Sequence, residues 1–490
     1  MTMRRAHIRT SQNPRDAFHR GARNASDRLR PGPIAVGFGG VIAFVWFAGF
    51  LIQQALRLQT RGFDQAFFQQ LTWNIGHGGG FATDLVPGSA LAVHFSPILV
   101  VPAFLERFWP NALLLSIVNA AALAAAVPAA YVFFRTLWPA TQAAQILAVA
   151  LAVVLPLAPF MQLADATNFH PDSLALPLAL LAAAAGLSGR RRAMWLLALM
   201  VLSVKEDQAY TMAVVGLLIW HTRGPLAADG RRLALASCIW GVLAFFVIIP
   251  AIDRASVPTD AGRLVTDSYY SWLPRASPGM ILNAIASPEA WGRLALLIAG
   301  LCGLPLLRPA WLALIAPPFL ASVLSAHHAQ AILHNHYGLL LAVPALVAAG
   351  MGGRRLLERP VPRLPRWGAL AAAPGLACGA LFGALPPFAQ PADTHSTSAL
   401  AGLQSCMAGL PPSAPVAADD NLMAPIASRP RIVLIDQATP GDYLAIDTAA
   451  NPPGWVNMTK RNAVINSLPR GRTLACSWKT ISIWTPETTG

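Results

Sequence analysis

The chain has 490 residues, of which 55% are hydrophobic and only 12% are charged, and its formal net charge is +14. A soluble protein carries about twice this proportion of charged residues, so the composition excludes an ordinary soluble domain. The basic residues, nearly all of them arginine, lie in short clusters between apolar runs. This pattern is typical of membrane topology and argues against nucleic-acid binding.

Apolar runs of about 20 residues recur along most of the chain, which predicts an all-α protein that crosses a membrane many times. Residues 1–33 are polar and rich in arginine, and we expect a disordered cytoplasmic tail. The first span is predicted from Ile34 to about Gln53, and no small-residue cleavage site closes it. With the basic tail held inside, the chain is expected to emerge on the outer side.

The predicted first outer loop, residues 54–93, places Asp64 among aromatic and amide side chains. A bare carboxylate beside lipid is costly, so such an acid is by default a candidate for function. The alternative is that Asp64 caps the helix that follows. Next, His94-Phe95-Ser96-Pro97 leads a short apolar piece that ends at Trp109. We place this piece at the outer interface, because Arg190–Arg192 then lie on the cytoplasmic side.

The later spans are expected to alternate across the membrane. They cover residues 111–134, 142–162, 172–188, 233–251, 291–307, 309–325, 337–351 and 367–388. Residues 193–220 lie between two basic loops, and their middle carries Lys205, Glu206 and Asp207. We interpret them as a short helical hairpin whose charged apex lies at depth toward the outer half. With the hairpin, residues 34–390 hold about eleven helices, and the C-terminus lies outside.

The last part of the chain, residues 391–490, differs in character because proline and polar residues increase and short β-like runs occur. The runs at 431–435, 442–446 and 480–484 predict strands, and hence a small α/β domain outside the membrane. Cys406 and Cys476 both lie in this domain. They can pair if the compartment is oxidising.

Five polar sites fall on the outer side and are candidates to converge: Asp64, His94, residues 165–172, residues 205–207 and residues 334–337. They suit the transfer of a sugar from a lipid phosphate. That reaction needs a carboxylate to take the acceptor proton, and cations or a metal to hold the departing phosphate. The catalytic candidates are Asp64 as the base and Lys205 as the phosphate holder. The candidate substrate-binding residues are His94, His170, Asp172, Glu206, Asp207, His336 and Tyr337.

A divalent metal ion is the candidate cofactor, with Asp64, His94 and His170 as candidate ligands. Each site also has a plainer interpretation. Lys205 with its acidic neighbours forms a satisfied ion cluster, and the histidines bond backbone or lie at the interface. For the whole protein, the alternatives to an enzyme are a transporter or flippase of a lipid-linked precursor, and a non-catalytic sensor or scaffold. Transporters often carry broken helices in both halves, and only one broken hairpin is visible here.

The same motifs carry a family resemblance. They are Gly62-Phe63-Asp64 through Trp73-Asn74, His94-Phe95-Ser96-Pro97, Asn168-Phe169-His170-Pro171-Asp172, Lys205-Glu206-Asp207, His336-Tyr337 and Ala418-Asp419-Asp420-Asn421-Leu422 to Asp442-Tyr443. Together they resemble a bacterial family of multi-spanning membrane proteins of unknown function. That family is in turn similar to the GT-C glycosyltransferases. These membrane enzymes use polyprenyl-phosphate-linked sugars and carry an essential aspartate in the first outer loop.

The resemblance implies a glycosyltransferase of the bacterial inner membrane, with lipid-linked sugar donors and membrane lipids as partners. Asp64 matches the catalytic or metal-binding aspartate. The Lys205 hairpin resembles the segment that often carries Thr-Lys-Gly near the lipid phosphate. The chain departs from its family at one motif, where Asn168 and Asp172 stand in place of the acids of Asp-Phe-His-Pro-Glu. This departure excludes acid chemistry at Asn168.

Overall fold

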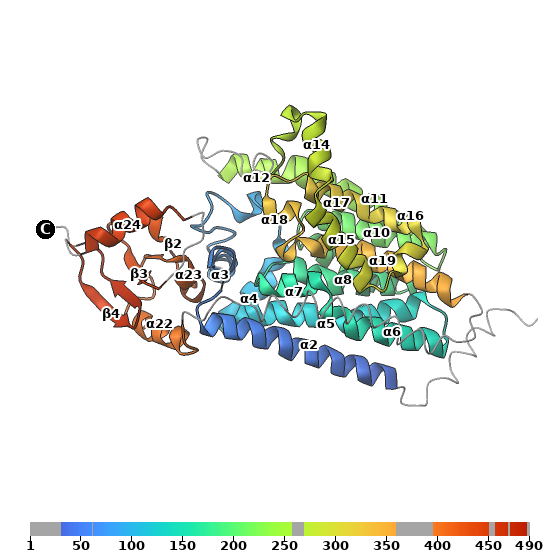
Figure 1. Cartoon of the computed structure of the whole chain (residues 1–490), viewed down its shortest axis with the longest axis horizontal. Coiled ribbons are helices and arrows are strands. Elements are labelled where there is room, and N and C mark those ends of the chain that lie inside the picture. Colours follow the sequence, from blue (N-terminus) through green and yellow to red (C-terminus); the bar gives the residue numbers. More distant parts are fainter. Residues whose placement is uncertain are drawn as a thin grey trace, which may run out of the picture.

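The structure is a computed structural model that describes residues 31–60, 62–256, 269–358, 395–449, 456–468 and 471–487. It has a helical body with a C-terminal sheet domain at one end (Figure 1). Helix α2 (Pro31–Leu56) runs along the body, and α3 (Gly62–Gly76) lies between the body and the sheet domain. Most of the predicted cytoplasmic tail and the predicted span at 367–388 lie outside the described residues.

Four helices form the centre of the body: α5 (Leu114–Leu137), α6 (Gln142–Val154), α8 (Asp172–Leu187) and α19 (Leu339–Leu357). Their contact surfaces are rich in alanine and glycine, which let helix backbones approach closely. At one such contact, Trp138 Nε1 donates to the carbonyl of Gly350 at 2.7 Å. A Cβ at Gly350 would lie 2.7 Å from Leu137 Cδ2, so a larger residue there would push α5 and α19 apart.

Shorter elements complete the body. They are η1 (Ala90–Ala92), η2 (Pro97–Leu99), α4 (Val100–Phe108), η3 (Leu155–Leu157), α7 (Pro159–Ala166), α9 (Arg191–Leu202), α10 (Gln208–His221), α11 (Ala227–Leu243), the π-helix η4 (Ala244–Ile248), α12 (Ile249–Ser256), η5 (Leu273–Arg275), α14 (Pro278–Ile285), α15 (Pro288–Gly300), η6 (Leu304–Leu307), α16 (Pro309–Leu312), η7 (Ala313–Ile315), α17 (Ala316–Val323), α18 (His328–Ala331) and η8 (Asn335–Gly338).

The membrane character of the body is confirmed by its helices. Five helical stretches of the described ranges are long and apolar enough to cross a membrane: Gly32–Leu56, Leu114–Leu137, Gln142–Ala166, Ala227–Ser256 and His328–Leu357. The apolar helices Asp172–Leu187 and Pro309–Val323 are shorter. The total of about eleven spans stays a prediction, because the predicted spans at 291–307 and 309–325 are broken into short segments. Pro305, Pro309 and Pro317 stand at the starts of these segments, where the missing backbone N–H costs nothing.

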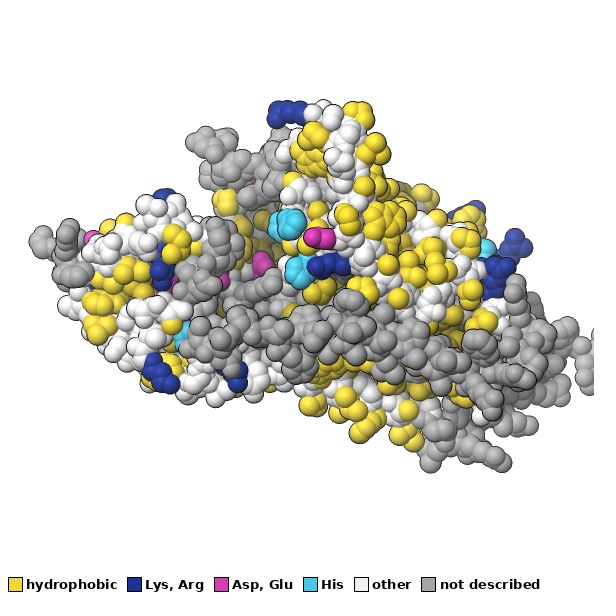
Figure 2. All heavy atoms as spheres, viewed as in Figure 1, with side chains coloured by type: hydrophobic (Ala, Val, Ile, Leu, Met, Phe, Trp, Pro, Cys, Tyr) yellow, Lys and Arg dark blue, Asp and Glu magenta, His cyan; other side chains and the backbone are white. Residues whose placement is uncertain are grey.

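The surface of the body is apolar over much of the face in Figure 2, as expected for contact with lipid. Helix α4 has an exposed apolar face, with Phe104 63% and Phe108 72% exposed, whereas Glu106 on its other face is buried. An amphipathic helix of this length suits a position at the membrane interface, which is where the sequence placed it. In Figure 2, some Lys and Arg side chains lie at the end of the body remote from the sheet domain, and others lie on the sheet domain and elsewhere on the body.

The predicted helical hairpin is present as α9 and α10, joined by a turn over residues 203–207. The backbone N–H of Ile98 donates to the carbonyl of Ser203 at 2.9 Å, so the turn packs on the segment that precedes α4. The sequence predicts an outer loop over residues 54–93. In the structure, helix α3 occupies Gly62–Gly76 of this segment.

The C-terminal domain is a five-stranded sheet with the order β2-β1-β3-β5-β4. Its strands are β1 (Val416–Ala418), β2 (Ile432–Leu434), β3 (Tyr443–Asp447), β4 (Leu474–Trp478) and β5 (Ile481–Trp484), and its helices are α22 (Ala399–Met407), α23 (Asp420–Ile426), η10 (Ile435–Gln437) and α24 (Met458–Ser467). Strand β1 pairs in parallel with β2 and β3, whereas β5 is antiparallel to β3 and β4. The three predicted strands correspond to β2, β3 and β5.

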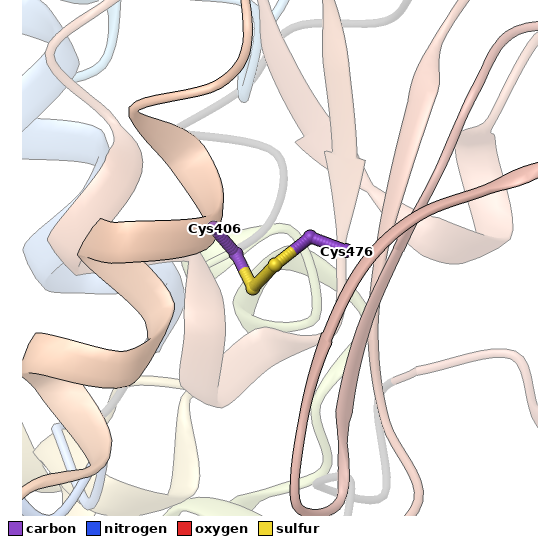
Figure 3. The surroundings of a disulfide bond; sticks show 2 residues. All are labelled: Cys406 and Cys476. Atoms are coloured by element: carbon purple, nitrogen blue, oxygen red, sulfur yellow. A yellow bond between two sulfur atoms is a disulfide. The ribbon is translucent and has the colours of Figure 1, made fainter.

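A disulfide bond joins Cys406 of α22 to Cys476 of β4 across the sheet domain (Figure 3). The two Cα atoms are 5.5 Å apart, and 70 residues separate the cysteines in sequence. The pairing that the sequence left open is therefore made in this structure.

Candidate functional site

A cavity of about 780 Å³ opens where α3, the turn of the α9–α10 hairpin and the segments before α8 and α19 meet the sheet domain. Most of the site residues predicted from sequence line it: Asp64, His94, His170, Asp172, Lys205, His336 and Tyr337. Aromatic side chains of α3, among them Phe67 and Phe68, form an apolar part of the wall. Segments far apart in sequence therefore converge as expected.

Asp64 lies in the first turn of α3 and is exposed on the cavity wall. The helix N-terminus carries partial positive charge, so an acidic side chain is well placed in this turn. Asp64 is the third residue of α3 rather than the residue that precedes it, and its exposure leaves the carboxylate open to a ligand. Asp64 therefore combines a structurally favourable place with chemical access.

Lys205 is buried and its charge is balanced by carboxylates. Its Nζ lies 3.1 Å from Asp207 Oδ2 and 3.8 Å from Asp172 Oδ1. Gln208 Nε2 donates to both acids, at 3.3 Å to Asp172 and 3.2 Å to Asp207. This is the satisfied ion cluster considered as the alternative, although Lys205 and Asp172 also face the cavity. An anion that reaches Lys205 would replace the longer contact, to Asp172.

Glu206 does not line the cavity but holds one of its walls. Its Oε1 lies 3.0 Å from Nδ1 of His94, and its Oε2 accepts from the backbone N–H of Phe95 at 2.9 Å. Glu206 is buried, with 2% of its surface exposed, and its two contacts hold the segment of His94 and Phe95 in place. Asp207 likewise stands behind Lys205 rather than on the wall.

The rings of His170 and His336 stack at a centroid distance of 3.6 Å with an interplanar angle of 21°. The edge of the pair is closed by Phe68, whose ring meets His170 at 5.5 Å in a T-shaped contact. Both histidines are buried, and Nδ1 of His336 has no hydrogen-bond partner among the described residues. Asn168, two residues before His170, has a positive φ of 66°, which turns the chain so that His170 faces the cavity.

Other candidates lie elsewhere. Asp165 is buried in α7 and does not line the cavity. Nδ1 of His334 lies 2.8 Å from Nη1 of Arg293. Within the described ranges, no three His, Cys, Asp or Glu side chains are grouped so that they could hold a metal ion. The metal assignment to Asp64, His94 and His170 stays a prediction.

Three titratable residues that line the cavity were not among the predicted site residues: Tyr269, His327 and Asp420. His327 Nδ1 lies 3.5 Å from the hydroxyl of Tyr337, one of the predicted site residues. Asp420 is the least expected, because it comes from the sheet domain. The available signal was its place in the motif Ala418-Asp419-Asp420-Asn421-Leu422, one of those that carry the family resemblance.

Asp420 is partly buried beside α3, and its Oδ2 accepts from the backbone N–H of Gly62 at 3.2 Å. Burial raises the pKa of Asp420 to about 6, although the N–H groups of Gly62 and Phe63 act in the opposite direction. The negative charges of Asp64 and Asp419 raise this pKa further. Besides Asp64 and Asp172, the cavity is thus lined by a carboxyl group whose pKa is raised by burial.

Fold and site together define a multi-pass helical membrane protein with a polar cavity beside a C-terminal sheet domain. Residues 54–485 match the family described as "Predicted membrane protein (DUF2079)". The chain belongs to this family, which confirms the family resemblance drawn from its motifs. It matches none of the curated proteins with which it was compared.

The solved structures that are similar to this chain include two of one protein. One is ArnT from Cupriavidus metallidurans bound to undecaprenyl phosphate, with a TM-score of 0.49, 13% identity, and coverage of 92% of this chain and 98% of ArnT. The other is the same protein in the apo state, with a TM-score of 0.46, 13% identity, and coverage of 91% and 98%.

Proposed function

We propose that the protein is a GT-C-like membrane glycosyltransferase that moves a sugar from a polyprenyl-phosphate donor to an acceptor hydroxyl. The observation that carries this proposal is a single cavity that combines an exposed carboxylate, Asp64, with a buried ammonium group, Lys205, and a stacked imidazole pair. In the reaction, the acceptor oxygen bonds to the anomeric carbon. The bond from that carbon to the phosphate oxygen breaks, and the phosphate leaves with the electron pair.

Asp64 is the proposed base, which takes the proton of the acceptor hydroxyl as the oxygen attacks. A general base has to be accessible and within hydrogen-bond reach of the proton that it removes. Asp64 meets the first condition, because it is exposed on the cavity wall. In-line attack would invert the configuration at the anomeric carbon, since the acceptor and the phosphate lie on opposite faces of the sugar.

Lys205 is the proposed holder of the departing phosphate. Its ammonium group has three N–H donors. Asp207 lies within hydrogen-bond distance at 3.1 Å, whereas Asp172, at 3.8 Å, is an ion-pair contact only. The two carboxylates cancel its charge, so Lys205 alone does not neutralise a phosphate. His170 and His336 supply further N–H donors on the same wall, and His94 stands close to the hairpin turn through Glu206.

Two features support a lipid-linked donor and an outward-facing site. The segment of His94 and Ser96 lines the cavity and leads into α4, whose exposed face is apolar. A polyprenyl chain can therefore lie in the bilayer beside α4 while its phosphate enters the cavity. Helices α8, α10 and α19 begin near the cavity, and each ends at a basic segment: Arg190–Arg192, Arg223 and Arg354–Arg355.

The positive-inside rule places these basic ends in the cytoplasm. The cavity and the C-terminus then lie on the outer side of a bacterial inner membrane, the N-terminus lies inside, and the chain crosses in about eleven helices. In an oxidising outer compartment the Cys406–Cys476 bond would persist, which agrees with this orientation.

The test is turnover by the purified protein in lipid vesicles, supplied with a panel of undecaprenyl-phosphate-linked sugars. The release of undecaprenyl phosphate, dependent on an added acceptor fraction, is the expected result. Binding of the lipids with no release across the panel would contradict a transferase and favour transport or sensing.

A further inference from the structure

The start of helix α3 is in direct contact with the sheet domain. Gly62 N donates to Asp420 Oδ2 at 3.2 Å, and a Cβ at Gly62 would lie 1.6 Å from the carbonyl oxygen of Asp420. Only glycine fits between these two backbones without a shift. Asp64 follows two residues later in the same turn. The place of Asp64 in the cavity is therefore linked to the position of Asp420.

Asp420 lies at a special point of the sheet. Strand β1 is flanked by β2 on one side and β3 on the other, and all three are parallel. The carboxyl end of such a strand is the switch point of an open α/β sheet, where ligands usually bind. Here the N-terminus of α3 stands at this point, with its N–H groups directed at the Asp420 carboxylate.

The neighbouring residue, Asp419, is fixed by a buried network inside the sheet domain. Arg461 donates to it twice, at 2.6 Å and 2.9 Å, and the backbone N–H of Asp447 donates at 2.9 Å. Paired charges in bidentate geometry hold a backbone segment firmly. Asp419 therefore serves the sheet domain, and the carboxylate of Asp420 is directed away from it toward α3.

Two further contacts hold the same side of the body to the sheet domain. Asp84 Oδ2 accepts from Gln70 Nε2 of α3 at 2.6 Å and from the backbone N–H of Ile432 in β2 at 3.1 Å. Glu106 of α4 accepts from Thr72 of α3 at 2.6 Å and from Ser428 at 2.7 Å. The helix that carries Asp64 is thus held between α4 and the sheet domain along its length.

We infer that Asp420 is a positioning residue of the proposed transferase, through which the sheet domain holds the N-terminus of α3 and so fixes Asp64 in the cavity. This inference rests on the proposed function. The sheet domain then contributes to the geometry of the site by positioning Asp64. Because the contact is a hydrogen bond to an oxygen, an asparagine at 420 keeps it and an alanine does not.

The test compares Asp420→Asn with Asp420→Ala in the turnover assay. A displacement of about 1 Å at a reacting group lowers the rate about 100-fold, so Asp420→Ala is expected to lose kcat on that scale with the KM for the donor lipid little changed. Asp420→Asn is expected to keep most of the kcat at neutral pH. The control is Asp436→Ala, which removes a hydrogen bond to the backbone of Asn457 in the same domain but away from α3.

A merely structural role would lower the folding yield or the unfolding temperature of Asp420→Ala and leave its kcat per folded molecule unchanged. That outcome would overturn the inference, as would equal kcat for Asp420→Ala and wild type.

A second readout needs no turnover, so it separates this inference from the proposed function. Asp64→Cys is introduced with Cys238, Cys302 and Cys378 replaced by serine, and its rate of labelling by a thiol reagent is measured. Adding Asp420→Ala is expected to change this rate several-fold, and adding Asp420→Asn is expected to leave it unchanged. Equal labelling in all three proteins would overturn the inference even if the wild-type protein proved inactive.

Discussion

Glu206 reaches across 112 residues of sequence to His94, with 3.0 Å between Oε1 and Nδ1, and its other oxygen accepts from Phe95 N. Both carboxylate oxygens of Glu206 thus contact one segment of the cavity wall. This geometry gives Glu206 a supporting part beside the proposed site, whereas the sequence suggested contact with substrate.

Glu206→Ala is expected to destabilise the protein, because it removes two hydrogen-bonding contacts, to the Phe95 N–H and to a nitrogen of His94. Both partners are partly exposed, so each contact contributes about 0.5–1.5 kcal/mol and a fall in the unfolding temperature is predicted. Glu206→Gln keeps an acceptor for Phe95 and should cost less. Equal unfolding temperatures for wild type and Glu206→Ala would show that the contact does not support the fold.

Gly62→Ala tests the close approach of α3 to the sheet domain. The added methyl would meet the carbonyl of Asp420 at 1.6 Å, so the two backbones have to separate. Overpacking of this kind typically costs about 1–3 kcal/mol, and the shift should also lower turnover. Gly49→Ala in α2 is the matched control, since a Cβ there meets nothing within 4 Å. Indistinguishable behaviour of the two variants would contradict the contact.

Replacing both Cys406 and Cys476 by serine should destabilise the sheet domain by about 2–4 kcal/mol, because the unfolded domain gains the freedom of a long loop. The measurement is the denaturant midpoint of the sheet-domain transition, followed with and without reductant. Reductant should lower the wild-type midpoint to that of the double variant. Cys238→Ser is the control, because Cys238 is an exposed free thiol. A wild-type midpoint that does not respond to reductant would contradict a stabilising bond.

The raised pKa of Asp420 predicts a specific dependence of stability on pH. A carboxyl group with a pKa of about 6 when folded, against 3.8 in its ordinary state, binds its proton more tightly in the folded protein. Its contribution to stability is therefore fully present below about pH 4 and is lost as the pH rises through about 6. Relative to Asp420→Asn, the unfolding temperature of the wild type should fall between these pH values.

Taking the difference between the two proteins removes the effects of other titrating groups. The charged neighbours that face Asp420 are Asp64 from α3 and Asp419 from its own segment, and Arg461 already pairs with Asp419. A difference that stays constant from pH 4 to pH 7 would contradict the raised pKa.

Much of the fold could be predicted from periodicity and composition. The long apolar runs form α2, α5, α8 and α19, and the charged residues that begin at Lys205 lie in the turn of a helical hairpin. Strands β1 and β4 were missed because Val416–Ala418 has only three residues and the β4 residues Leu474–Trp478 do not alternate cleanly between apolar and polar. Helix α3 was read as loop, since its polar amides Gln69 and Gln70 face partners in other segments rather than water.

The candidate site was partly predictable for a physical reason. Polar residues in an apolar chain are costly, so Asp64, His170 and Lys205 stand out against their surroundings. Which of them contact the cavity depends on tertiary pairing, which sequence does not reveal. Glu206 and Asp207 look like Lys205 in sequence but stand behind the wall. Asp420 belongs to a motif of the family resemblance, but its place beside the cavity depends on the contact between the sheet domain and α3.

The central claim, that Asp64 is the base of a sugar transfer, is tested most directly by Asp64→Asn in the release assay for undecaprenyl phosphate. Asparagine keeps the shape of the side chain but cannot accept the proton, so turnover should fall by about 100-fold to 10,000-fold while donor binding is retained. Glu289→Gln, which neutralises an exposed acid outside the cavity, should leave turnover unchanged. Wild-type turnover in Asp64→Asn would contradict the account.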